Sequence, residues 1–189
     1  MKKWYALYVK MHHEKKLSQR LSDKGVEHFL PIQTVVRQWS DRKKKIDQVV
    51  IPMMIFVHVE EQERTAILED SSAISFFTLR GSHKPTVIPD HDMERFMFMF
   101  DFTESAIKFC PDTLTPGCRV RVIKGPLLGL EGELVQRYGH HEVGIQIPYL
   151  GYATVEIPVG YLLKLDDKKK AFQFFLNALH LYFYLSLPQ

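Results

Sequence analysis

The chain has 189 residues, of which 46% are apolar and 25% are charged, so it is long enough for one or two folded domains and unlike a disordered or fibrous protein. Its formal net charge of +3 is too small to indicate a nucleic-acid or membrane partner. Two cysteines, Cys110 and Cys118, exclude a disulfide framework, and Lys10 interrupts the short apolar start, so no signal peptide is predicted. These features favour a soluble, cytoplasmic protein.

Charge is distributed unevenly along the chain. Residues 1–50 carry 12 basic and 5 acidic side chains, residues 51–110 carry 5 basic and 10 acidic ones, and residues 111–165 carry 5 of each. Because the local electrostatic field follows this distribution and not its sum, an anionic partner is expected at the first fifty residues.

The first hundred residues show the periodicities of a small domain with helices and strands. Residues 4–9 are apolar, aromatic or β-branched, which predicts a buried strand. Leu17 and Leu21 lie four apart among polar residues and Gly25 follows, which predicts an amphipathic helix with a left-handed glycine cap. Further strands are expected over 26–36, 49–59, 74–79 and 87–88, and further helices over 60–70 and from Pro89 onward. The short connection between 36 and 49 predicts a hairpin and hence an antiparallel sheet.

Domain boundaries follow from changes in this pattern. Residues 103–114 lack the periodicity of a helix or strand, which predicts a linker that lets two domains reorient. Residues 115–165 alternate short β-rich segments with Gly or Pro turns every eight to twelve residues, which is typical of a small β-barrel. The fold class is therefore expected to be α+β, with domains at 1–102 and 115–165.

Residues 166–189 form an apolar tail that is predicted to be helical. Its polar residues Gln173, Asn177, His180 and Tyr184 recur at helical spacing and give one narrow polar stripe. The stripe argues against stable insertion in a membrane. The tail is expected to pack on its own domains, to form a dimer or to cover a binding surface.

Two motifs in the chain resemble known ones. Residues 117–132 (GCRVRVIKGPLLGLEG) resemble the KOW motif, in which a strand, a Gly-Pro turn and a spaced glycine open a five-stranded SH3-like barrel. Residues 4–16 (WYALYVKMHHEKK) and 51–57 (IPMMIFV) resemble the NusG amino-terminal domain. In this order, over residues 1–165, they resemble the NusG family of transcription elongation and antitermination factors.

The resemblance implies an antiparallel sheet flanked by helices, then the SH3-like barrel, then the tail helix. Met53, Met54, Leu127 and Leu150 stand where the family has other residues. Such departures are expected of a specialised paralogue of the RfaH or UpxY type.

The resemblance also places binding residues in the first domain. It implies docking on the clamp helices of RNA polymerase through an apolar surface, and a contact with the opposite jaw of the polymerase. The clamp-helix residues would be Tyr8, Ile51, Pro52, Met54 and Phe56, and the jaw residues Arg64 and Thr65. The alternative for Ile51 and Phe56 is a place in the core, because strand alternation exposes only one parity.

A basic cluster lies in the predicted hairpin loop. It consists of Arg37, Arg42, Lys43, Lys44 and Lys45, with Trp39 among them. Cations that neutralise phosphates together with an aromatic ring for stacking are typical of nucleic-acid binding. A solvated loop is the alternative. In family terms this cluster would contact upstream or displaced non-template DNA.

The implied function is suppression of pausing or termination at RNA polymerase, without catalysis. The barrel would recruit a ribosomal protein or RNA through Leu127, Tyr149 and Leu150. The alternatives are a KOW-containing RNA-binding or ribosome-associated protein and, from the tail alone, a membrane-attached regulator.

The residues give no indication of an enzyme. The nine histidines are scattered, the two cysteines lack a C-x-x-C partner, and no phosphate-binding loop is present. We therefore expect no metal, no cofactor and no small-molecule substrate.

Overall fold

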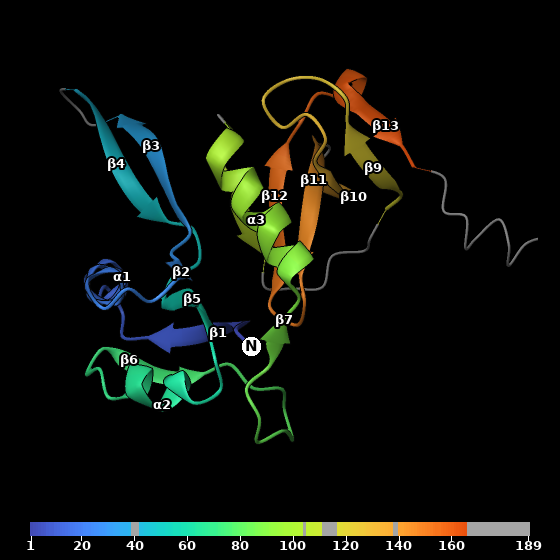
Figure 1. The fold of residues 1–189 in the computed structure, drawn as a ribbon. Helices are drawn as coiled ribbons and strands as arrows, with labels where there is room; N and C mark the ends of the chain where they lie inside the picture. Colours follow the sequence, from blue (N-terminus) through green and yellow to red (C-terminus); the bar gives the residue numbers. More distant parts are fainter. Residues whose placement is uncertain (39–41, 104, 111–116, 138–139, 166–189) are drawn as a thin grey trace, which may run out of the picture.

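The computed structural model describes residues 1–38, 42–103, 105–110, 117–137 and 140–165 (Figure 1). These residues form an amino-terminal half with a five-stranded antiparallel sheet, a separate two-stranded sheet and three helices, and a carboxy-terminal half that is a six-stranded antiparallel sheet. This confirms the α+β fold class. The expected tail helix at 166–189 lies outside the described residues.

The amino-terminal sheet is built around its first strand. Its strands run in the order β2 (His28–Phe29), β5 (Met54–Val59), β1 (Lys3–Val9) and β6 (Ala73–Phe76), and β7 (Val87–Ile88) also pairs with β1. The helices are α1 (Glu14–Asp23), α2 (Glu63–Leu68) and α3 (Asp90–Phe102). Gly25 follows α1 with φ of +67°, as expected for the left-handed cap.

Both faces of this sheet are covered. Trp4 and Ala6 on β1 belong to one buried cluster, whereas Tyr5 and Leu7, the residues that alternate with them, belong to another. The first cluster contains apolar residues of α3, and the second contains apolar residues of α1 and α2. The central strands β1 and β5 are therefore buried on both sides, and strand parity exposes neither face of them.

The expected strand over 49–59 is interrupted. Its first part belongs to β4 (Lys43–Val49), which pairs with β3 (Ile32–Gln38) as a separate two-stranded sheet, and its second part is β5. Residues 50–53 turn between the two sheets. Pro52 has no N–H to continue a ladder, and Met53 has φ of +59°, which an extended strand does not accommodate.

The carboxy-terminal sheet contains the five strands expected from the β-rich segments and one more. Its order is β13 (Leu162–Lys164), β9 (Arg119–Val122), β10 (Glu131–Arg137), β11 (His140–Ile147), β12 (Gly151–Glu156) and β8 (Lys108–Cys110). A Cβ on Gly132 would lie 2.6 Å from the carbonyl oxygen of Gly144, so β10 and β11 approach this closely because residue 132 has no side chain.

The sixth strand corrects the expectation of a linker over 103–114. Residues 108–110 of that segment form β8, which pairs with β12, and Ile107 is buried. Residue 104 and residues 111–114 lie outside the described residues. A β-branched and an aromatic residue, Ile107 and Phe109, supply the apolar surface that this pairing covers, and charged neighbours obscure them in the sequence.

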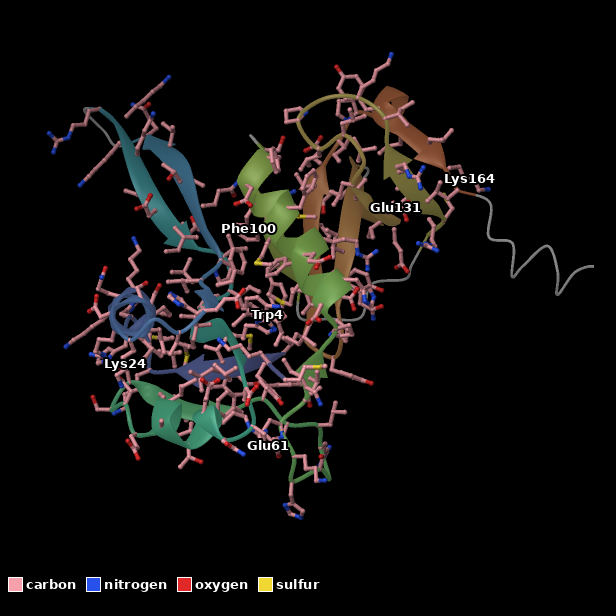
Figure 2. The ribbon with its side chains drawn as sticks, in the orientation of Figure 1. Trp4, Lys24, Glu61, Phe100, Glu131 and Lys164 are labelled. Atoms are coloured by element: carbon pink, nitrogen blue, oxygen red, sulfur yellow. The ribbon has the colours of Figure 1, made fainter. Side chains whose placement is uncertain are left out.

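Helix α3 lies between the amino-terminal sheet and the carboxy-terminal sheet and contacts β1 of the first and β11 of the second (Figure 1). Its Met93, Phe96 and Met99 are fully buried in a cluster that continues into the carboxy-terminal sheet. Figure 2 labels two residues of this cluster's surroundings. Trp4 on β1 is buried in the cluster, and Phe100 on α3 is partly buried and packs against it. Apolar residues around most of the helix are therefore explained by burial on two sides.

Candidate functional site

The predicted clamp-helix residues lie around the turn between β4 and β5. Pro52 is exposed and Tyr8 is half-buried, with its ring 6.2 Å from that of Phe77. Ile51, Met54 and Phe56 are 3%, 6% and 0% exposed. Ile51, Met54 and Phe56 therefore do not lie on the predicted docking surface: they belong to the buried cluster that contains residues of α3, as the core alternative for Ile51 and Phe56 has it.

Phe56 has the packing of a core residue. Its ring contacts that of Phe96 on α3 edge to face at 5.6 Å, and it lies 6.5 Å from the ring of Phe29. Phe29 in turn meets Phe100 at 5.4 Å. Edge-to-face geometry is the favourable arrangement for aromatic pairs, so these rings fix α3 on the sheet.

The exposed turn at Pro52 is held by hydrogen bonds on both sides of Met53. The backbone N–H of Met53 donates to Oε1 of Glu14 at 2.9 Å, and the N–H of Val9 donates to the carbonyl oxygen of Met53 at 2.9 Å. Glu14 is only 5% exposed. The turn is therefore preorganised, which suits a surface that binds a rigid partner.

The predicted jaw residues lie on α2. The side chain of Arg64 is 15% exposed; its Nη2 donates to Glu61 at 2.6 Å, and its guanidinium lies 5.1 Å from the ring centre of Tyr5. Glu61 is labelled in Figure 2. Thr65 is exposed. In this structure Arg64 stabilises the helix and its contact with β1, and Thr65 is the residue of the pair that faces solvent.

The basic cluster lies mainly on strands and not in a loop. Arg37 is on β3, and Lys43, Lys44 and Lys45 are on β4; the last three and Arg42 are exposed. Trp39 lies outside the described residues. The ladder continues through the lysines because backbone groups make its hydrogen bonds, so the exposed lysine side chains do not interrupt it.

The β3–β4 ribbon extends away from the amino-terminal sheet (Figure 1). Its register pairs Gln38 with Lys43 and Val36 with Lys45, and on the alternate face Arg37 with Lys44. Cationic positions therefore occur on both faces of the ribbon near its tip.

The base of the ribbon contacts α1. Nζ of Lys15 lies 3.7 Å from Oδ2 of Asp47, and Thr34 donates to Oδ1 of the same carboxylate at 2.8 Å. Lys15 thus adds a cation beside the ribbon. Arg20, also on α1, does not add a cation beside the ribbon, because its Nη2 donates to Oδ1 of Asp70 and to Oγ of Ser72, both at 2.6 Å.

The carboxyl of Asp70 is held in its ionised form. Burial raises its pKa, but the backbone N–H of Ser72 and the guanidinium of Arg20 outweigh this effect, so its pKa lies below the ordinary value. Glu131, labelled in Figure 2, has a lowered pKa because Arg121 donates to it and outweighs its partial burial. Both carboxylates therefore contribute to the stability of the fold.

The predicted partner-binding residues of the barrel do not form one surface. Leu127 and Leu150 are 5% and 8% exposed and belong to the core, whereas Tyr149 is 65% exposed with φ of +66°. Leu128, which is not among the predicted residues, is 61% exposed and lines a cavity of about 480 Å³ with Phe98 of α3. Its only signal is its place in the Gly-Pro turn.

Within the described ranges, no three His, Cys, Asp or Glu side chains lie together as metal ligands would. Among the same residues, no helix has the length and apolar character needed to cross a membrane.

Comparisons with known proteins agree with this geometry. The family described as transcription termination factor NusG matches residues 2–97. No curated protein matches the chain. A solved structure of Thermotoga maritima NusG, described as showing a domain interaction, is 18% identical over 88% of this chain and 98% of its own, with a TM-score of 0.50. The MjSpt4:Spt5 complex, in its conformation A, is 12% identical over 86% of this chain and 98% of its own, with a TM-score of 0.28.

The family match covers half of the chain and coincides with the amino-terminal sheet and most of α3. The likeness to the Thermotoga structure extends over 88% of this chain and concerns the fold. The chain belongs to the NusG family.

Proposed function

We propose that the protein is a transcription elongation factor that binds RNA polymerase and suppresses pausing or termination without catalysis. The observation that carries this proposal is the match of residues 2–97 to the NusG family, together with an exposed, preorganised turn in that region. Binding that favours the elongating state of the polymerase by about 1.4 kcal/mol shifts its balance with the paused state tenfold. The protein would act where the polymerase is, in the cytoplasm.

The polymerase contact is proposed at the turn around Pro52. Pro52 and Thr65 are exposed and Tyr8 is half-buried, so these three offer surface to a partner. Ile51, Met54 and Phe56 support that surface from beneath, because they are buried. A proline and an aromatic ring suit the apolar side of a pair of clamp helices.

The nucleic-acid contact is proposed at the β3–β4 ribbon. Its support is the set of exposed cations Arg42, Lys43, Lys44 and Lys45, on or beside β4. The ribbon formed by β3 and β4 extends beyond the amino-terminal sheet (Figure 1). Upstream duplex or displaced non-template strand is the proposed ligand, with phosphate neutralisation as the main source of affinity.

The carboxy-terminal sheet is proposed to recruit a second partner, a ribosomal protein or RNA, through Tyr149. Formal charge over 111–165 is balanced, whereas a ribosomal RNA-binding protein is expected to be densely basic. This balance favours the elongation factor over the ribosome-associated alternative.

The proposed function is tested by capture of core RNA polymerase on immobilised protein. Pro52→Glu is expected to reduce recovery of the polymerase at least tenfold, because it places a charge in an apolar contact. The matched control, Ile74→Glu, introduces the same charge at a residue that is 51% exposed on β6 and is expected to leave recovery unchanged. Wild-type recovery with Pro52→Glu would contradict the proposed surface, and no recovery with the wild type would contradict the function.

A further inference from the structure

The cavity of about 480 Å³ beside α3 is here called the α3 groove. It is lined by Glu94, Arg95 and Phe98 of α3 and by residues 128–131, which lead into β10. An apolar cavity of about 150 Å³ holds one benzene molecule, so the α3 groove has room for about three apolar side chains. It therefore accommodates a segment of polypeptide and not only a single side chain.

Apolar side chains are exposed at both walls of the groove. Leu128 is 61% exposed on one side. On the other side Phe98 is partly buried, and its ring lies 4.6 Å from that of Phe102, which is 50% exposed one turn further along α3. Apolar surface that continues over two elements is unfavourable in water and indicates an apolar partner.

The last described residues of the chain lie close to this groove. Leu163 of β13 pairs with Arg121 of β9, which in turn pairs with Glu131 of β10, so these three residues form one row across the sheet. Side chains of paired residues lie on the same face of a sheet, and Glu131 lines the groove. The N–H of Leu165 still donates to β9, at the carbonyl oxygen of Arg119, 2.8 Å away.

The next five residues are long enough to reach the groove. Residue 165 lies two strand spacings from β10 and two residues beyond the row of Glu131, which together separate it from the edge of the groove by about 12 Å. Lys164 and Glu131, labelled in Figure 2, mark the two ends of this path. Residues 166–170 (DDKKK) extend up to about 17 Å, and their charges suit a connection through solvent.

The sequence of residues 171–189 suits the α3 groove. Apolar residues at spacings of four, three and four share one face of the predicted helix, separate from the polar stripe: Phe172, Leu176, Leu179 and Phe183. At a rise of 1.5 Å per residue this face is about 17 Å long, and the stretch of α3 from residue 94 to residue 102 is about 12 Å long. Occupant and groove therefore match in length as well as in chemistry.

We propose that residues 171–185 occupy the α3 groove of their own chain, with the apolar face of the tail against Phe98 and Leu128. The short connection gives the chain's own tail an effective concentration of the order of millimolar, which favours it over the tail of a second copy. This binding requires neither RNA polymerase nor nucleic acid, so its test is independent of the proposed function.

The test is photo-crosslinking in the full chain. p-Benzoylphenylalanine at Leu128 places the reactive group in the groove, and the irradiated protein is digested with trypsin. Residues 171–189 contain no Lys or Arg, so trypsin releases them as one peptide that mass spectrometry identifies. The expected product joins this peptide to the labelled turn. The same label at Ile74 of β6, which is 51% exposed, is expected to give no such product.

Isotope labelling shows which copy of the chain supplies the tail. A mixture of heavy and light protein is irradiated, and each crosslinked product is weighed. Products that join heavy to heavy and light to light are expected, because the groove and its tail belong to one chain. Products that join heavy to light in equal proportion would assign the groove to the tail of a second copy and would overturn the proposal.

Two substitutions in the tail show which of its faces enters the groove. Leu179→Asp places a carboxylate on the apolar face and is expected to lower the yield roughly tenfold. Asn177→Asp introduces the same charge on the polar stripe and is expected to leave the yield unchanged. A label at Glu94, on the α3 wall, decides the matter if the label at Leu128 displaces the tail. No product from either position, or equal yields from the two tail variants, overturns the proposal.

Discussion

The carboxylate of Glu14, buried at the start of α1, accepts a hydrogen bond of 2.9 Å from the backbone N–H of Met53, 39 residues further along the chain. Met53 has a left-handed φ of +59°, a conformation that costs a non-glycine residue about 1–3 kcal/mol. The bond therefore offsets strain at the turn that presents Pro52. A helix on one face of the sheet sets the geometry of the surface proposed for the polymerase.

Two substitutions of Glu14 measure how much this hydrogen bond contributes to stability, apart from the other contacts of α1. Glu14→Ala leaves the Met53 N–H unsatisfied and is expected to lower the free energy of unfolding by about 2–3 kcal/mol. Glu14→Gln retains a carbonyl acceptor and is expected to cost less than about 1 kcal/mol. Urea unfolding with linear extrapolation measures both values. Equal losses for the two variants would show that the hydrogen bond is not the cause.

A substitution of Phe56 tests whether this predicted clamp-helix residue belongs to the core or to a binding surface. Its side chain is fully buried against Phe96, so Phe56→Ala is expected to lower the free energy of unfolding by about 3–5 kcal/mol. Val36→Ala on the ribbon, where the side chain is 59% exposed, is expected to change it by less than about 0.5 kcal/mol. A Phe56→Ala protein of wild-type stability that fails to capture polymerase would contradict the core assignment.

Sequence periodicity predicts most elements of the amino-terminal half because each has one face that differs from the other. Leu17 and Leu21 give α1 its buried stripe, and both are 3% exposed or less. Periodicity fails at Met54 and Phe56, where β5 is buried on both faces and parity carries no information. It also fails at Lys43, where a run of cations resembles a loop although the backbone continues a ladder.

The candidate site is less predictable than the fold, because it depends on contacts between residues far apart in sequence. Glu14 and Gln33 bind backbone groups 39 and 74 positions away, and no local pattern distinguishes them from other polar residues. Arg64 is predicted as a contact residue, but its guanidinium is engaged by Glu61 and Tyr5. Side-chain partners of this kind follow from the packed fold and not from spacing.

Acid is expected to weaken the fold through Asp70. Its pKa in the folded state is lowered from the ordinary value of 3.8, with burial outweighed by the hydrogen bonds of Ser72 and Arg20. A lowered pKa means that the unfolded state binds more protons in this range, so the contribution of Asp70 is present above about pH 4 and is lost as the pH falls through the folded value. The stability difference between wild type and Asp70→Asn should therefore shrink below about pH 4. Urea unfolding at a series of pH values measures it, and a constant difference would contradict the assignment.

The lysines of β4 are expected to set the salt dependence of nucleic-acid binding. Each phosphate neutralised contributes about 0.9 to the slope of log affinity against log salt on duplex DNA, so replacing Lys43, Lys44 and Lys45 by Ala should lower the slope by up to about 2.7. Fluorescence anisotropy with labelled duplex and single-stranded DNA at several salt concentrations measures the slope for both candidate ligands.

The matched control for this variant changes net charge equally at a distance from the ribbon. Lys84, Lys124 and Lys164 are exposed and lie outside β3 and β4, so their replacement by Ala removes three charges without touching the ribbon. This control should keep nearly the wild-type slope, because salt dependence reports counterions released where phosphates bind and not the total charge. An equal fall in slope for both triple variants would mean that affinity follows net charge, and the ribbon would then not be the binding surface.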